Sequence, residues 1–331
     1  MKMTVQFFFL AMVVSANASA AVHNKDVWRA RDKGAEFDVV FRIVDDEGSP
    51  VVGARCGGWI YMERDRDHGC GYAEYADTNG CVRIVGKCSE WFSVVVRKEG
   101  YYRTMFDVKY PAQDANPPIV DGKWQPYGET RTVVLKRIKK PTAVSVLPSS
   151  LRDVKIPAYG VWVGFDFERA DWCSPYGNGK FDDVLLRFTS DVRKRNFDFT
   201  YRMEASFTNC PYAGAYLMKK DGFSDLKSVY SADTNAAYVS TWAFSTLSDP
   251  SKPVILNYLN KDSYLVFRTR TQVDANGNLV GAHYGKIYGE WHTIERAMKL
   301  FDGCFNPVEN DTNIEGDRTL LYNIHDNKKA K

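Results

Sequence analysis

Short runs in which apolar and polar residues alternate, separated by glycine-containing turns, are the feature that most limits how this chain can fold. Phe37, Val39, Phe41 and Ile43 recur at every second position, and the run ends in the turn-forming stretch 45–50. A period of two places such side chains on one face of a half-buried strand. Further runs of this kind occupy residues 51–61, 82–85, 92–96, 102–108 and 131–135. About seven short strands in a segment of this length predict a β-sandwich.

The second half of the chain shows the same pattern. Strands are predicted at 161–167, 184–189, 197–207, 215–218, 237–244, 264–273 and 279–288. Asn276-Gly277 joins the last two and predicts a two-residue type I′ turn, in which both residues have positive φ. Residues 291–301 have helical spacing, with a strand as the alternative. We therefore predict an all-β chain: an N-terminal transthyretin-like or immunoglobulin-like sandwich and a second, mostly antiparallel β domain.

The first 20 residues have the order of a secretory signal peptide. Lys2 precedes an apolar stretch at 5–14 and a run of small residues at 16–21. The apolar stretch is shorter than the roughly 20 residues that span a bilayer. We expect cleavage near Ala20, export to the periplasm, the cell surface or the medium, and no membrane span.

The remaining chain divides at a proline-containing stretch. Residues 36–138 form the predicted sandwich, and 139–150 contain Pro141, Pro148 and three serines, which is typical of an extended linker. The second domain is predicted at 151–318, followed by a polar tail at 319–331. Terminal polar residues of this kind are seldom tied down.

Three segments of the first domain carry a family resemblance. The stretches 46–54, 77–80 and 98–102 read DEGSPVVGA, DTNG and KEGYY. They resemble signatures of the carboxypeptidase regulatory-like, or transthyretin-like, β-sandwich family, which implies an accessory module that usually lacks catalytic residues. In the second domain, 164–171, 175–180, 305–307 and 310–317 are similar to uncharacterised exported proteins, a resemblance that names no activity.

The expected export predicts that cysteines of the chain form disulfides. The sequence has seven cysteines, of which Cys56, Cys70, Cys81 and Cys88 lie in the first domain. Exported chains form disulfides, and four cysteines permit two bridges with three connectivities, among which the sequence does not choose. The three in the second domain leave at least one thiol. Because no Cys-x-x-Cys pair occurs, zinc is not expected.

Charge and loop composition exclude several partners. The formal net charge is +3, or 3 − 1 = +2 without Lys2, and the basic clusters at 136–140 and 193–195 are short and separate. Nucleic-acid binding needs a contiguous basic face. The stretch 177–180 lacks the flanking residues of a phosphate loop. The oxygen-rich loop 274–278 lacks the bidentate Glu of an EF-hand, and nothing in the sequence supports calcium at the second such loop, 311–317. No nucleic acid, cofactor or metal is predicted.

Three carboxylates are the candidates for catalysis. Asp166 and Glu168 share one face of a predicted strand, and Asp171 follows. Paired carboxylates hydrolyse glycosides. The segment is similar to the DGFDFDWE signature of chitinase-type hydrolases, but Val163 replaces the leading Asp and Ala170 stands where the catalytic Glu belongs.

Aromatic residues make up 14% of the chain and gather in pairs beside predicted turns. The pairs are Trp59 with Tyr61, Tyr72 with Tyr75, Tyr101 with Tyr102, and Trp124 with Tyr127. One member of each is expected to be exposed, and such rings hold sugars or proteins. The leading hypothesis is an exported, non-catalytic binding or surface module whose partner is a glycan or another cell-surface or periplasmic protein. An extracellular glycan hydrolase using Asp166, Glu168 and Asp171 is the alternative.

Overall fold

The computed structural model describes residues 29–30, 32–62, 70–110, 119–141, 145–146, 154–194, 198–249, 252–257, 259–289, 291–299 and 303–316. After one helical turn before residue 35, every named element in these ranges is a strand. The all-β prediction is therefore confirmed. Within the same ranges, no helix is long and apolar enough to cross a membrane. The predicted signal peptide and the tail at 319–331 lie outside the described residues.

The chain divides into two compact units. The first contains residues 1–43, 50–96 and 106–133, and the second contains 44–49, 97–105 and 134–331. The predicted linker at 139–150 lies partly outside the described residues.

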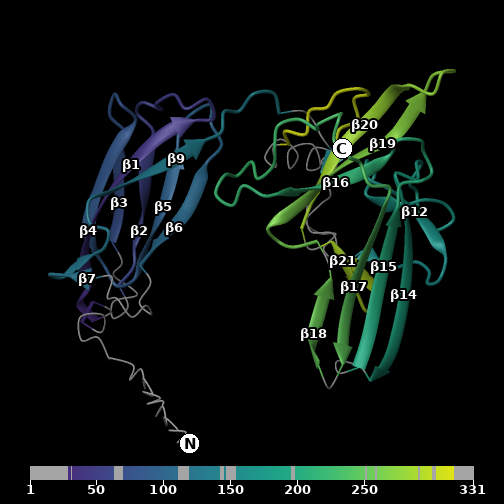
Figure 1. Cartoon of the computed structure of the whole chain (residues 1–331), viewed down its shortest axis with the longest axis horizontal. Helices are drawn as coiled ribbons and strands as arrows, with labels where there is room; N and C mark the ends of the chain where they lie inside the picture. The colour runs from purple at the N-terminus through teal and green to yellow at the C-terminus, as the bar shows by residue number, and fades with distance from the viewer. Residues whose placement is uncertain are drawn as a thin grey trace, which may run out of the picture. The chain divides into compact units, whose positions relative to one another are not determined.

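The strands of the first sandwich form two sheets. Their bounds are β1 (Ala35–Asp45), β2 (Arg55–Ile60), β3 (Cys70–Tyr75), β4 (Cys81–Cys88), β5 (Trp91–Arg97), β6 (Thr104–Lys109), β7 (Ile119–Val120), β8 (Lys123–Trp124) and β9 (Glu129–Leu135). One sheet has the order β4-β1-β8-β7, with β9 also paired to β1, and the other has the order β3-β2-β5-β6 (Figure 1).

The core of this sandwich comes from the alternation in β1. Phe37, Val39 and Phe41 are buried, and Phe37 stacks on Phe92 of the other sheet with ring centroids 4.2 Å apart. Phe41 meets the same ring edge-on at 6.5 Å. Burying one such side chain stabilises the fold by about 1.5–3 kcal/mol.

Three turns share one geometry in which an aspartate organises the backbone. The Oδ1 atoms of Asp45, Asp77 and Asp274 each accept the backbone N–H four residues later at 2.8 Å. A glycine with positive φ precedes that N–H in each turn. The type I′ prediction for Asn276-Gly277 is wrong because Gly277 alone has positive φ there, and the loop spans five residues, 274–278. The carboxylate of Asp274 satisfies the turn instead.

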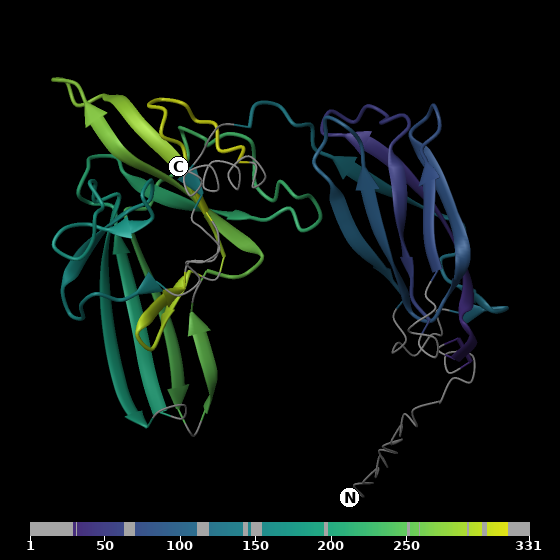
Figure 2. The same cartoon turned by 180° about the vertical axis from the view of Figure 1, so that it is seen from behind.

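The second unit contains two large sheets and one small one. Their strands are β10 (Ser145–Val146), β11 (Val154–Lys155), β12 (Trp162–Asp166), β13 (Asp171–Trp172), β14 (Val184–Lys194), β15 (Asp198–Ser206), β16 (Gly214–Lys219), β17 (Thr241–Asp249), β18 (Lys252–Asn257), β19 (Ser263–Val273), β20 (Leu279–Tyr288), β21 (His292–Ile294), β22 (Ala297–Lys299) and β23 (Gly303–Phe305). The orders are β13-β12-β14-β15-β17-β18, β10-β23-β20-β19-β16 and β11-β22-β21 (Figures 1 and 2).

Aromatic side chains fill the space between the two large sheets. Phe165 and Phe167, at the end of β12, meet edge-on at 5.8 Å. Phe167 stacks on Phe267 of β19 with centroids 4.5 Å apart, and Phe305 of β23 lies next to Phe267. The second unit is therefore also built of packed sheets with inward-facing rings.

A helix is predicted at 291–301, and the described part of that range, 291–299, is not helical. These residues contain the hairpin of β21 and β22, which lies against β15 and β17 and crosses them in Figure 2. Trp291 Nε1 donates to the Met298 sulfur at 3.4 Å, and Glu295 in the turn has a φ of 49°. A spacing of seven brings two side chains together on a helix face and also across a short hairpin, so the pattern fits both. The alternative of a strand is confirmed.

The predicted disulfides are absent, since all seven cysteines are described and none is bonded to another. Strand register places Cys56, Cys70, Cys81 and Cys88 opposite Glu74, Ile60, Arg42 and Ala35. A disulfide needs Cα atoms within about 7 Å, whereas seven residues of β4 separate Cys81 from Cys88 by about 23 Å. Burial raises the pKa of both Cys56 and Cys88 to about 12, which keeps them protonated.

Candidate functional site

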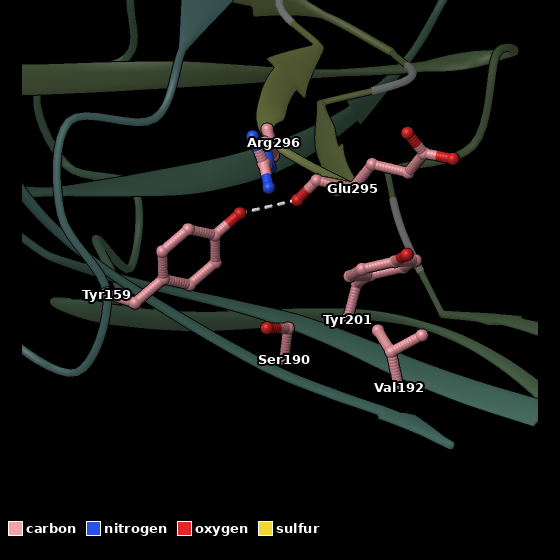
Figure 3. A pocket seen from close by; sticks show the side chains of 6 residues that line it. All are labelled: Tyr159, Ser190, Val192, Tyr201, Glu295 and Arg296. Atoms are coloured by element: carbon pink, nitrogen blue, oxygen red, sulfur yellow. Dashed lines mark hydrogen bonds between the residues drawn. The ribbon is translucent and has the colours of Figure 1, made fainter. Parts of the chain in front are cut away.

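The inner face of the six-stranded sheet continues beyond the core of the second unit. Phe188 of β14 and Met203 of β15 are buried cross-strand partners. The next inward pair along these strands is Ser190 with Tyr201, followed by Val192. Ser190, Val192 and Tyr201 line an open hollow with a volume of about 540 Å³ (Figure 3).

The opposite wall is made by Tyr159 and by the turn between β21 and β22. The Tyr159 hydroxyl donates to the Glu295 backbone oxygen at 2.5 Å (Figure 3). The backbone N–H of Ile156 donates to the backbone oxygen of Arg296 at 2.9 Å. Both turn residues are therefore tied to the segment that leads into β12.

The hollow is lined by two charged side chains, Glu295 and Arg296, and Arg296 is the one that acts on the Tyr159 hydroxyl. Burial raises the pKa of the Tyr159 hydroxyl, the neighbouring Tyr201 adds to the rise, and the Arg296 guanidinium opposes it. Tyr159 is therefore neutral around pH 7, while Arg296 is charged at any physiological pH. In Figure 3 the Glu295 side chain extends away from Tyr159, toward the side of Tyr201.

This lining suits binding better than bond cleavage. Tyrosine rings offer flat apolar faces with polar edges, and a guanidinium and a hydroxyl supply directional hydrogen bonds. Glycoside hydrolysis requires two carboxyl groups, and Glu295 is the single carboxylate among the lining residues. In the described part of the chain, no group of three His, Cys, Asp or Glu side chains could hold a metal ion.

Two of the three predicted acids meet at an arginine that the sequence analysis missed. Glu168 contacts Nη1 of Arg270 at 2.6 Å, and Asp166 contacts Nη2 at 3.2 Å. Asp166 is fully buried and also accepts the backbone N–H groups of Arg169 at 3.0 Å and Lys180 at 2.8 Å. Its carboxylate therefore already holds two segments of the chain.

Asp183 is the buried centre of this cluster. It accepts from Nε of Arg270 at 2.8 Å, from Nη2 at 3.0 Å and from the Phe167 N–H at 2.9 Å. Burial raises the pKa of Asp183, and the hydrogen bonds from Arg270 work against that rise. We call Asp166, Glu168, Asp183 and Arg270 the Arg270 cluster.

Asp171 lies outside the Arg270 cluster. It accepts the N–H of Trp172 at 2.8 Å and of Asn178 at 2.9 Å, which fixes the loop that contains 177–180. The structure thus brings Asp166 and Glu168 together and directs Asp171 elsewhere.

Three of the four predicted aromatic pairs have one exposed member. Trp59, Tyr75 and Tyr127 are exposed, whereas Trp124 is buried and donates through Nε1 to the Cys88 oxygen at 2.9 Å. Tyr61 stacks on Trp91 at 4.9 Å. The prediction holds for three pairs and fails for Tyr101 with Tyr102, neither of which is among the exposed residues.

Comparisons with known proteins give no family for this chain. No family model matches, and no curated protein matches. Solved structures give distant matches. Hydroxyquinol 1,2-dioxygenase from Pseudomonas putida is 18% identical, with 31% of this chain and 57% of that chain covered and a TM-score of 0.24. The major pilin SpaD from Corynebacterium diphtheriae is 10% identical over 84% of this chain and 83% of the pilin, with a TM-score of 0.23.

A third match is described as a "putative carbohydrate binding protein" from Bacteroides uniformis. It is 11% identical, with 84% of this chain and 100% of that chain covered and a TM-score of 0.19. The chain spans less than two thirds of the length of the dioxygenases it matches. TM-scores this low support no inference about function.

Proposed function

We propose that this protein is an exported, non-catalytic module that binds a glycan in the hollow formed by Tyr159, Tyr201 and Arg296. The observation that carries the proposal is the lining itself, which has two tyrosines and a guanidinium but a single carboxylate. Tyr201 lies on β15, and Tyr159 and Arg296 face it from the opposite wall. Export rests on the predicted signal peptide, and the accessory role rests on the transthyretin-like resemblance of the first domain. Both remain predictions.

The size and chemistry of the hollow suit a sugar unit. Its volume of about 540 Å³ falls in the range of about 300–1,000 Å³ that is usual for small-ligand sites. A pyranose ring has an apolar face that packs on an aromatic ring and hydroxyls around its edge. Ser190 and Arg296 supply polar groups to the lining. These features favour a glycan over a purely apolar ligand.

The proposal predicts that Tyr159→Ala weakens glycan binding about tenfold, which corresponds to about 1.4 kcal/mol. Tyr159 is 41% exposed, so its ring contributes more to the hollow than to the core. The measurement is a glycan array with the full chain, followed by calorimetric titration of the glycans that bind.

Tyr176→Ala is the matched control, because Tyr176 is 44% exposed, lies in the same unit and does not line the hollow. It should leave binding unchanged. Equal losses in both variants, or a folded protein that binds no glycan, would show that the hollow is not a glycan site. Release of reducing sugar from bound glycans would favour the hydrolase alternative.

A further inference from the structure

We infer that the hollow selects a sugar that carries a carboxylate, and that Arg296 is the residue that binds this group. The inference rests on the proposed glycan binding and names the class of sugar.

Arg296 is held at the tip of a short, fixed hairpin. Glu295 and Arg296 connect β21 and β22, which pair through Ile294 and Ala297. The backbone oxygens of both turn residues accept hydrogen bonds, from Tyr159 at 2.5 Å and from Ile156 at 2.9 Å. A residue presented on a fixed backbone loses less conformational entropy when it binds a ligand.

The guanidinium of Arg296 has no carboxylate partner among the described residues of the second unit. Four other arginines of this unit show what pairing looks like: Arg187, Arg202, Arg270 and Arg103 each contact a carboxylate within 3.2 Å. The carboxylate of Glu295 extends away from Tyr159 in Figure 3. The Arg296 charge is therefore available to a ligand in the hollow.

The Tyr159 hydroxyl beside Arg296 accepts hydrogen bonds from a ligand, and the Glu295 side chain extends away from Tyr159 in Figure 3. The Tyr159 hydroxyl donates its hydrogen to the Glu295 backbone oxygen. The lone pairs of the hydroxyl oxygen can therefore accept hydrogen bonds from the hydroxyls of a sugar. A planar guanidinium binds a carboxylate through two parallel N–H···O bonds, which a neutral sugar hydroxyl cannot reproduce. Arg296 can thus bind the carboxylate of a ligand, and the Tyr159 hydroxyl can accept a hydrogen bond from a neighbouring sugar hydroxyl.

The test compares three uronate polymers, polygalacturonate, alginate and hyaluronate, with their carboxyl-reduced forms, in which –COO⁻ becomes –CH₂OH. We expect at least one uronate to bind the full chain about tenfold more tightly than its reduced form at low ionic strength. The preference should shrink as salt is raised, because the pair is partly exposed to screening.

Variants assign the preference to Arg296. Arg296→Gln should bring the two affinities together, and Arg296→Lys should retain part of the preference because the charge remains but the fork does not. Arg193→Gln is the charge-matched control, since Arg193 is also exposed, lies on β14 and does not line the hollow. It should keep the full preference.

The outcomes separate the two proposals. Equal affinity for uronates and reduced polymers would overturn the acidic-sugar inference and leave glycan binding standing. A preference lost equally in Arg193→Gln would also overturn it, because the effect would then be one of net charge. Folded protein that binds neither polymer form nor any other glycan would overturn the proposed function itself.

Discussion

Replacing Arg270 with methionine should lower the free energy of unfolding by about 3–5 kcal/mol, the usual cost of leaving a buried ion-pair partner uncompensated. Methionine keeps much of the volume of the side chain but removes every contact with Asp166, Glu168 and Asp183. Asp183 is fully buried and would lose its main counter-charge. The measurement is urea-induced unfolding followed by tryptophan fluorescence.

The loss should also depend on pH, with a sign that follows from Asp183. Its pKa in the folded protein is already raised from 3.8 by burial, and removing Arg270 raises it further. A carboxyl with a raised folded pKa binds its proton more tightly when folded, so stability falls as pH rises from about the unfolded pKa through the folded one. The deficit of Arg270→Met should therefore be smaller at pH 4.5 than at pH 7.

Arg187→Met is the control for the loss of an ordinary ion pair. Arg187 contacts Glu204 through Nε at 2.6 Å, but both side chains are partly exposed. Exposed pairs contribute about 0–1 kcal/mol. If Arg187→Met and Arg270→Met cost the same, the Arg270 cluster is not a buried anchor.

Gly285→Ala should cost about 3 kcal/mol, the upper part of the usual range for overpacking a core. Gly285 lies on β20, and a methyl group there would overlap the Phe267 ring and the backbone oxygen of Cys304. The Phe267 ring is packed in the core and the Cys304 oxygen belongs to the backbone of β23, so neither can move away easily. Urea unfolding midpoints measure the effect.

Gly222→Ala is the matched substitution in an open position. A methyl group at Gly222 meets no atom within 4 Å. Its effect should stay within about 0.5 kcal/mol, as for most surface changes. Similar midpoints for the two variants would mean that β20 and β23 are not in close contact at Gly285.

Local patterns were enough to predict the strands but not every connection between them. The alternation at Phe37 to Ile43 and the paired runs on either side of Gly277 each specify one element without reference to the rest of the chain. The hairpin at 292–299 was ambiguous because Trp291 and Met298 have a spacing that two structures satisfy. The turn at Asp274 was misassigned because its side chain, rather than the Asn-Gly pair, determines the backbone geometry.

The functional residues were harder to predict because they come from distant segments. Asp166 and Glu168 were recognisable as neighbours on one strand, but Arg270 is 104 positions from Asp166. The hollow combines Tyr159, Tyr201 and Arg296, and its existence depends on where the opposing sheet stops covering β14 and β15. Alternation shows which side chains face inward, not which of them remain uncovered. Disulfides were predicted because the chain was expected to be exported. The strand register, which the sequence does not reveal, leaves no two of the first unit's cysteines directly opposite each other.

The Arg270 cluster gives the second unit a cross-link that needs no oxidant. Arg270 ties its strand to a segment 87 to 104 positions away, as a cystine would, but the link re-forms whenever the chain refolds. Its strength depends on the exclusion of water rather than on the redox potential outside. Dithiothreitol should leave the Arg270 cluster intact. Guanidinium chloride should disrupt the cluster at lower concentrations than its general denaturing effect requires, because the guanidinium ion competes with Arg270 for the carboxylates.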